Sequence, residues 1–387
     1  MLPLSRAAAA VLRTRPVQSR ASTLSRVVIP TLPCRRHLHL EGVALAPVYF
    51  GGLFVALWTW KCCMLVIFQN KIIYMPGMPP NARWEKIEDY SNQCGGIKWR
   101  EERTRATDGT DLALCVADLD IGQPPNGSET QNPDSSVYIL YCQGNASSTP
   151  PRLPDLSSAL CMLKRRLHED AHTTRITFVC LSYRGYWTSR GRPTERGIRL
   201  DAAAALQWIS HLHEKSTTRD GTVLGSLDAP RPAQVFLWGQ SVGAGIATNL
   251  AAEHAMPSNL RLNSLILETP FTSIRAMLEV LYPQKWLPYK YLWPFLRNHL
   301  DSLTNLGLIS SKYKDSQTSP RILILEAAKD ELVPATLSQR LHDRAAEVGL
   351  DSERRAVSGA FHNDTMFRAE GRRTVSEFIA QRIECTT

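Results

Sequence analysis

The hydrophobic pattern of the chain begins with an almost uninterrupted apolar stretch near the N-terminus. It runs for 26 residues from Val43 to Phe68, and Lys61 is its one charged residue. About 20 apolar residues suffice to cross the ~30 Å hydrocarbon core of a bilayer, whereas buried helices of soluble proteins seldom stay apolar for so long. The pattern therefore predicts a single transmembrane helix over residues 43–68, with Lys61 reaching toward the interface.

A different pattern extends over residues 69–387. Two extended runs within residues 97–118 flank Asp108-Gly109, which is typical of an antiparallel hairpin. Short apolar runs without polar alternation then alternate with helical stretches, which indicates a mostly parallel sheet covered by helices on both faces. We expect one α/β domain. Its predicted strands are 137–142, 176–181, 235–238, 265–267, 322–325 and 354–357, and its clearest helical patterns are 200–213 and 244–254.

The distribution of charge separates the N-terminus from the rest of the chain. The formal net charge is +9, and seven arginines without any acidic residue give residues 1–40 a charge of +7. Nucleic-acid binding would need a basic surface on the folded domain itself, so the sequence argues against a nucleic-acid partner. No protein partner can be identified from the sequence.

An acid-free segment rich in arginine and serine is typical of a mitochondrial targeting sequence, and a basic cytosolic tail that orients the next helix is the alternative. In both cases the positive charges place the α/β domain on the opposite side of the membrane. The membrane is then the endoplasmic reticulum or another secretory membrane, or the mitochondrial inner membrane.

The nine cysteines do not indicate a metal site. They form no Cys-x-x-Cys pair and no spacing with histidine that is typical of zinc. Several of them, such as Cys142 and Cys180, lie in apolar runs and are predicted to be buried free thiols.

The segment around Ser241 carries the clearest chemical signal. Gly239-x-Ser241-x-Gly243 directly follows a strand pattern and begins a helical one. This arrangement is typical of a nucleophile elbow, a strained strand-to-helix turn that exposes a serine hydroxyl. Small residues are needed two positions on either side, because a side chain there would collide with a neighbouring strand or helix.

A serine nucleophile needs a histidine base, and the histidine needs a carboxylate that fixes its tautomer. In this architecture the acid and then the histidine follow the serine along the chain. Among the four histidines after Ser241, only His362 lies in a loop beyond the last predicted strand. Asp330 follows the strand run 321–325 at the carboxyl edge of the sheet, where such folds keep their sites. Asp301 and Glu268 are the alternatives for the acid.

The oxyanion of an acyl-transfer intermediate is usually stabilised by two backbone amides. The residue after the nucleophile, Val242, supplies one of them. The strand at residues 137–142 leads into Gln143-Gly144-Asn145, and we assign the second amide to Asn145. Chemistry of this kind needs no cofactor.

With these segments in place, the chain resembles the membrane-anchored α/β-hydrolase-domain families, the group that contains lysophosphatidylserine lipase and the Bem-type fungal proteins. The resemblance covers about residues 69–380. The motifs that carry it are Tyr183-Arg184-Gly185-Tyr186, Gly191-Arg192-Pro193-Thr194-Glu195-Arg196-Gly197 with Asp201, Trp238-Gly239-Gln240-Ser241, Leu267-Glu268-Thr269-Pro270-Phe271-Thr272-Ser273, Lys329-Asp330-Glu331-Leu332-Val333-Pro334 and His362-Asn363-Asp364-Thr365.

The resemblance implies the α/β-hydrolase fold and a catalytic triad of Ser241, Asp330 and His362. Two positions depart from the pattern of the relatives. Gln143 stands where they usually have histidine, and Trp187 stands where a glycine commonly follows the Tyr-Arg-Gly-Tyr run. Neither change removes a catalytic group. Asp201 is interpreted as a structural residue.

A region rich in aromatic residues and proline, residues 271–320, predicts a small cap on the catalytic domain. Its aromatic side chains either form an apolar rim that admits a lipid chain to Ser241 or pack an irregular insertion onto the sheet. The expected organisation is thus a basic tail (1–40), a transmembrane helix (43–68) and a catalytic domain (69–387).

The sequence leads to the hypothesis of a membrane-anchored serine hydrolase. Family resemblance and the anchor indicate a lysophospholipid or a monoacylglycerol as the substrate. An acyl-protein thioesterase is an alternative, because ester and thioester cleavage use the same groups. A catalytically silent membrane scaffold is the alternative from another class of protein.

Overall fold

The computed structural model describes residues 40–122, 135–167, 173–219, 232–285, 287–314 and 319–385. The expected basic tail lies outside the described residues, apart from Leu40. The chain divides into two compact units, residues 1–56 and residues 57–387.

Helix α1 (Leu40–Ile67) corresponds to the predicted apolar helix. By length and composition its stretch Leu45–Ile67 could cross a membrane, and none of its residues is buried. Among the described residues, it is the one helix with these properties. It is compatible with a single-pass membrane anchor.

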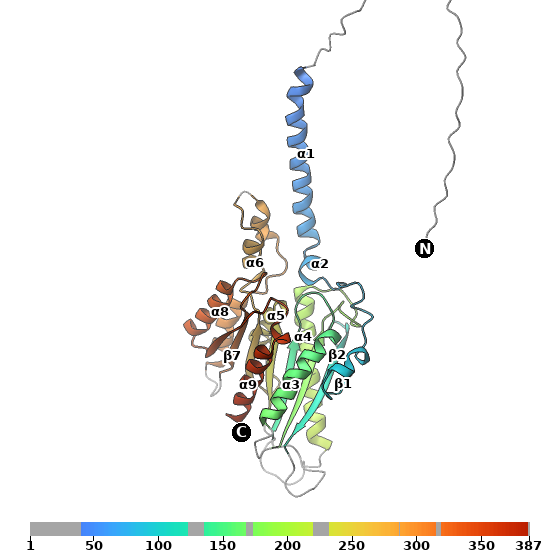
Figure 1. Cartoon of the computed structure of the whole chain (residues 1–387), viewed down its shortest axis with the longest axis vertical. Helices are drawn as coiled ribbons and strands as arrows, with labels where there is room; N and C mark the ends of the chain where they lie inside the picture. The colour runs from blue at the N-terminus through green and yellow to red at the C-terminus, as the bar shows by residue number, and fades with distance from the viewer. Residues whose placement is uncertain are drawn as a thin grey trace, which may run out of the picture. The chain divides into compact units, whose positions relative to one another are not determined.

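The second unit is built on an eight-stranded sheet in the order β1-β2-β4-β3-β5-β6-β7-β8 (Figure 1). Strand β2 pairs antiparallel with β1 and with β4, and the other pairs are parallel. The predicted hairpin and the predicted mostly parallel sheet are therefore confirmed. The strands are β1 (Trp99–Arg105), β2 (Asp111–Ile121), β3 (Ser135–Cys142), β4 (Thr174–Ser182), β5 (Ala233–Gln240), β6 (Leu260–Glu268), β7 (Arg321–Ala327) and β8 (Ser352–Val357).

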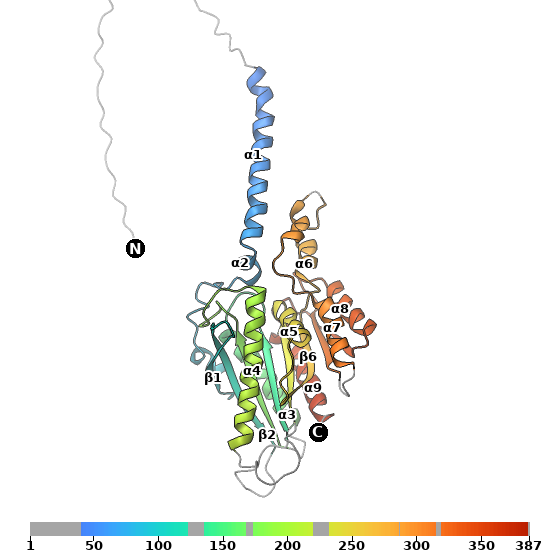
Figure 2. The same cartoon turned by 180° about the vertical axis from the view of Figure 1, so that it is seen from behind.

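Helices cover both faces of this sheet, as Figures 1 and 2 show from opposite sides. Residues of α3 and α9 pack on one face, and residues of α4, α5, α7 and α8 pack on the other. Both faces of the central strands are therefore apolar, which explains why their sequences show no polar alternation. The helices after α1 are α2 (Gln69–Tyr74), α3 (Leu153–Leu167), α4 (Glu195–Arg219), α5 (Val242–Glu253), α6 (Ile274–Leu281), α7 (Ser302–Tyr313), α8 (Ala335–Glu347) and α9 (Ala369–Glu384), with the 3₁₀ turns η1 (Glu88–Gln93), η2 (Pro150–Arg152), η3 (Pro288–Phe295) and η4 (Thr365–Phe367).

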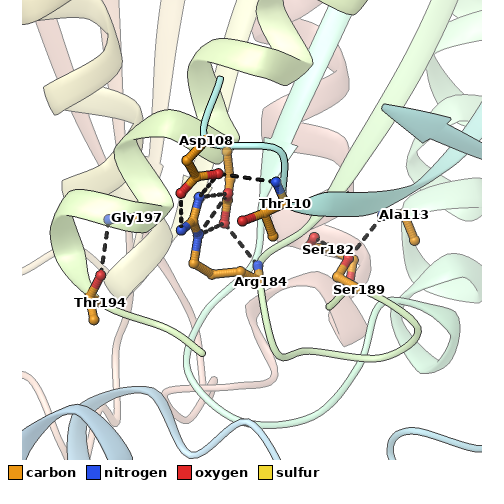
Figure 3. A network of polar contacts seen from close by, with 9 residues as sticks. Asp108, Thr110, Ala113, Ser182, Arg184, Ser189, Thr194 and Gly197 are labelled. Carbon is orange, nitrogen blue, oxygen red and sulfur yellow. Dashed lines mark hydrogen bonds and ion pairs between the residues drawn. The ribbon is translucent and has the colours of Figure 1, made fainter. Parts of the chain in front are cut away.

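A guanidinium group with little exposure fixes the loop after β4 (Figure 3). Arg184 donates to both carboxylate oxygens of the fully buried Asp201 on α4, at 2.7–3.1 Å, and to Asp108 of the β1–β2 turn at 2.7 Å. Burial raises the pKa of Asp201, and the hydrogen bonds from Arg184 oppose this shift. At the exposed end of the network, the same guanidinium lowers the pKa of Asp108 to about 2. The network therefore joins the hairpin, the β4 loop and α4.

We expect Asp201→Asn to lower the free energy of unfolding by about 3 kcal/mol, because removing one partner of a buried ion pair leaves the other charge uncompensated. Urea-induced unfolding of the full chain in detergent measures this change. The matched control is Asp120→Asn, because Asp120 pairs with Arg175 at 2.8 Å while its side chain is 74% exposed. The control should lose less than about 1 kcal/mol. Equal losses in the two variants would contradict a structural role for the buried network.

Candidate active site

Ser241 lies in the turn between β5 and α5, in an unusual backbone conformation. Its φ is 52° and its ψ is −114°, a positive φ that non-glycine residues rarely adopt. Its amide donates to the Glu268 carbonyl at the end of β6, at 2.8 Å. The residue is 7% exposed. The turn therefore holds the hydroxyl at the carboxyl edge of the sheet, as the nucleophile-elbow prediction requires.

The two glycines that flank Ser241 have no room for a side chain. A Cβ atom at Gly239 would lie 2.2 Å from the Gly243 carbonyl oxygen. A Cβ atom at Gly243 would lie 1.9 Å from the carbonyl oxygen of Cys142, the last residue of β3. The first turn of α5 thus lies directly against the end of β3, and this close approach explains the Gly-x-Ser-x-Gly spacing.

The structure brings Ser241, His362 and Asp330 together in one hydrogen-bonded chain. The Ser241 hydroxyl lies 3.0 Å from His362 Nε2, and His362 Nδ1 lies 2.9 Å from the Asp330 carboxylate. His362 comes from the loop after β8 and Asp330 from the loop after β7. Both side chains are almost completely buried. Three loops that are distant in sequence meet here because parallel strands end at the same edge of a sheet.

The loop that carries Asp330 is itself held by hydrogen bonds. The Asp330 carboxylate accepts from the amides of Leu332 and Val333, at 2.9 and 2.7 Å. The Glu331 carboxylate accepts from the amide of His362 at 3.0 Å. Glu331 therefore joins the acid loop to the histidine loop. We did not predict this role, since only the approach of the two loops in space reveals it.

The two alternative acids have other partners. Asp301 accepts from the Thr304 amide at 3.1 Å and caps the N-terminus of α7. Glu268 is buried and accepts from Trp238 Nε1 at 3.1 Å and from the Thr365 hydroxyl. Burial raises the pKa of Glu268, while these hydrogen bonds oppose the shift. Neither carboxylate forms a hydrogen bond with His362 in the described part of the chain, so the geometry favours Asp330.

The amides assigned to the oxyanion hole lie at the two segments that meet at Gly243. Val242 is the first residue of α5, where amides have no acceptor within the helix. Asn145 follows Gly144 in the loop after β3. Within the described residues, neither amide donates to an acceptor of the protein. The two amides therefore stay the predicted donors of the oxyanion hole.

Residues 74–78, which begin with the last residue of α2, support the loop after β3. This loop carries the predicted amide of Asn145 and is here called the oxyanion loop. The sequence did not reveal this support. Ala146 and Ser147 both have positive φ values, 58° and 63°. The Ala146 amide donates to the Tyr74 carbonyl at 3.0 Å, and the Ser147 amide donates to the Met78 carbonyl. The Tyr186 hydroxyl donates to the same carbonyl of Tyr74. Residues 74–78 thus hold the loop through their backbone, which leaves no signature in side-chain identity.

The two departures from the family pattern are both buried. Gln143 accepts from the Thr149 hydroxyl at 3.0 Å through its side chain. Trp187 has a φ of 40°, in the region that favours glycine, and its indole donates to the Glu85 carbonyl at 2.7 Å. Burial and this hydrogen bond offset the backbone strain at Trp187. Its side chain faces the segment around residue 85.

The arrangement has the parts of an acyl-transfer site of the serine type. Among the described residues, no group of three or more His, Cys, Asp or Glu side chains is placed to hold a metal ion.

The fold of the chain is similar to that of solved α/β hydrolases. A solved α/β hydrolase from Vibrio vulnificus aligns with a TM-score of 0.50 and 16% identity, over 83% of this chain and 92% of that one. The chain therefore has the α/β-hydrolase fold.

The chain is also similar to curated proteins in sequence, although no protein-family model matches it. An uncharacterised protein of Mycobacterium tuberculosis is 31% identical over 230 residues, which are 59% of this chain and 64% of the relative. The lysophosphatidylserine lipase of Danio rerio is 34% identical over 217 residues, 55% of this chain and 48% of the lipase. The matched segment thus covers less than two thirds of either relative.

We expect Gly243→Ala to destabilise the fold strongly, because the new methyl group would overlap the Cys142 carbonyl and force α5 away from β3. The expected loss is about 3 kcal/mol or more, measured by urea unfolding. Gly307→Ala in α7 is the control, since its Cβ would meet only the end of the Arg344 side chain, at 3.0 Å. An unchanged free energy of unfolding in Gly243→Ala would contradict the close contact between α5 and the end of β3.

The raised pKa of Glu268 predicts a pH-dependent stability. A carboxyl with a raised pKa stabilises the fold most at low pH, and this contribution is lost as the pH rises from 4.5 through the folded-state pKa. Glu268→Gln stays neutral, so its free energy of unfolding relative to wild type should increase between pH 4.5 and neutral pH. Urea unfolding at both pH values tests this. Glu268→Ala, which lacks both hydrogen bonds, should be destabilised at both values. A constant difference between the glutamine variant and wild type would refute the assignment.

Proposed function

We propose that the chain is a membrane-anchored serine hydrolase that cleaves carboxylic esters of lipids. The observation that carries the proposal is the hydrogen-bonded chain from Ser241 through His362 to Asp330, with the serine in a strained turn. A structural serine would need neither this backbone conformation nor a buried histidine–carboxylate pair.

The proposed reaction follows from the positions of these groups. The Ser241 oxygen attacks the ester carbonyl, and His362 Nε2 takes the hydroxyl proton. The amides of Val242 and Asn145 stabilise the negative oxygen of the tetrahedral intermediate. His362 returns the proton to the leaving alcohol as the C–O bond breaks, and an acyl-enzyme remains. Water then attacks the acyl-enzyme by the same route, which releases the acid and restores Ser241. Asp330 keeps the imidazole in the required tautomer throughout.

The proposed substrate class is a lysophospholipid or a monoacylglycerol. Two observations support a lipid: the similarity to a lysophosphatidylserine lipase and an unburied apolar helix that could hold the site near a bilayer. We propose a single span through a secretory membrane, such as the endoplasmic reticulum, or through the mitochondrial inner membrane.

A fluorophosphonate probe tests the proposal, because it reacts covalently with an activated serine. The full chain in detergent should be labelled, and Ser241→Ala should not be labelled at all. Asp330→Asn should lower kcat for a short-chain ester by about ten-thousandfold, because the imidazole would lose its tautomer. Glu268→Gln should retain most of the activity. Folded wild-type protein that resists labelling would overturn the enzyme proposal and favour a silent scaffold.

A substrate panel then tests the lipid class. It contains lysophospholipids, a monoacylglycerol and a palmitoylated peptide, with the Ser241→Ala variant as the blank. We expect Ser241-dependent release of fatty acid from the lipids. Release from the peptide alone would instead identify an acyl-protein thioesterase.

A further inference from the structure

The segment from residue 274 to residue 297, here called the aromatic segment, exposes large apolar side chains. It comprises α6, a connection and η3, and Figures 1 and 2 show α6 at the same end of the sheet as α2. Leu281, Tyr291 and Phe295 are 55%, 56% and 61% exposed. A group of exposed apolar side chains within one segment marks an interaction site more often than a single exposed side chain does.

The aromatic segment is fixed against the C-terminal turns of α1, within the second compact unit. Arg297 donates through its guanidinium to the carbonyls of Val66 and Ile67, both at 3.0 Å. These carbonyls belong to the last turn of α1, where the helix supplies no amide donors for them. The Lys61 ammonium lies 4.7 Å from the centre of the Tyr289 ring. The segment therefore lies beside the end of the apolar helix.

A buried cluster of amide side chains holds the chain directly after the aromatic segment. Asn298 is fully buried, and its side-chain oxygen accepts from the Tyr74 hydroxyl at 3.1 Å and from the Glu195 amide at 3.0 Å. Its side-chain nitrogen donates to Asn70 at 2.7 Å and to Gln69 at 3.2 Å. These bonds join Asn298, the residue that directly follows the aromatic segment, to α2 and to the start of α4. The position of the segment is thus set by the hydrolase fold.

The chemistry of the segment matches a phospholipid surface. Residues 274–297 contain four basic side chains and one acidic one, a net charge of +3. The Arg275 guanidinium lies 4.2 Å from the Trp293 ring centre, and the Lys290 ammonium lies 5.0 Å from that of Tyr291. Aromatic rings paired with basic groups are characteristic of the membrane–water interface, where the rings lie at the level of the headgroups and the cations reach the phosphates.

We propose that the aromatic segment is a second membrane contact, in which Leu281, Tyr291 and Phe295 enter the phospholipid interface beside the end of α1. The proposal rests on the membrane span proposed above. The second contact would fix the orientation of the α/β domain at the membrane surface. A domain that is held at two points does not rotate about the end of α1. The segment also follows β6, whose last carbonyl binds the Ser241 amide. The membrane–water interface would therefore lie at the carboxyl edge of the sheet. A lipid substrate would then approach Ser241 from the bilayer.

Photo-crosslinking of the full chain in phosphatidylcholine vesicles that contain phosphatidylserine tests this contact. A photoreactive p-benzoylphenylalanine replaces Leu281 or Phe295, and intact-mass measurement detects a mass increase of one phospholipid. Leu308 on α7 is the matched control, since it is 46% exposed and lies outside the aromatic segment. The same photoreactive residue at position 54, in place of Phe54 of α1, tests separately whether α1 lies in the bilayer. Each variant is first shown to unfold at the wild-type temperature.

We expect lipid adducts at positions 281 and 295 and only background at position 308. Adducts at position 54 without adducts at 281 and 295 would overturn this inference while the span remains. Adducts at 281 and 295 without any at position 54 would support the contact and refute the span. A crosslink from position 281 or 295 to a second copy of the chain, in place of lipid, would also overturn the proposal.

Discussion

The close approach of α5 to the ends of β3 and β5 is the constraint on which the candidate site depends. Strands β3 and β5 are neighbours in the sheet, although β4 lies between them in the sequence. The turn that carries Ser241 and the loop after β3 can therefore meet only if nothing separates the first turn of α5 from the Cys142 carbonyl. Gly243 satisfies this condition. The strained conformation of Ser241 is a consequence, because the chain must reverse within one residue to begin a helix so close to the sheet.

The other half of the site depends on two loops that stabilise each other. The Lys329 amide donates to the Ala360 carbonyl at 2.8 Å, and Glu331 holds the amide of His362. These bonds fix the backbone on both sides of the imidazole, so its contact with Asp330 needs little further ordering of side chains. Preorganisation of this kind matters in acyl transfer, since a displacement of about 1 Å can reduce the rate a hundredfold.

The sequence revealed those features that depend on local pattern. The Gly-x-Ser-x-Gly turn, the apolar strands and the position of His362 after the last strand could all be read directly, because each is encoded within a few residues. The support of Ala146 by Tyr74 could not be predicted, since it joins backbone groups that are distant in sequence. The left-handed conformation of Trp187 was also not predicted, although the glycine that relatives commonly have at this position is a signal of positive φ. The antiparallel pairing of β2 with β4 likewise depends on the topology of the whole sheet.

The backbone contacts of Tyr74 and Met78 with the oxyanion loop bear on how a soluble fragment of this protein can be prepared. In sequence, the Pro-rich stretch around residue 78 resembles a dispensable linker between the apolar helix α1 and the α/β domain. A fragment that begins beyond it would lack the acceptors for the Ala146 and Ser147 amides, and the loop would have to satisfy them with water. Substitution of single side chains would not reproduce this defect, since the carbonyls belong to the main chain. The natural starting point for such a fragment is therefore at or before Gln69, whose side chain also bonds to the Phe295 carbonyl.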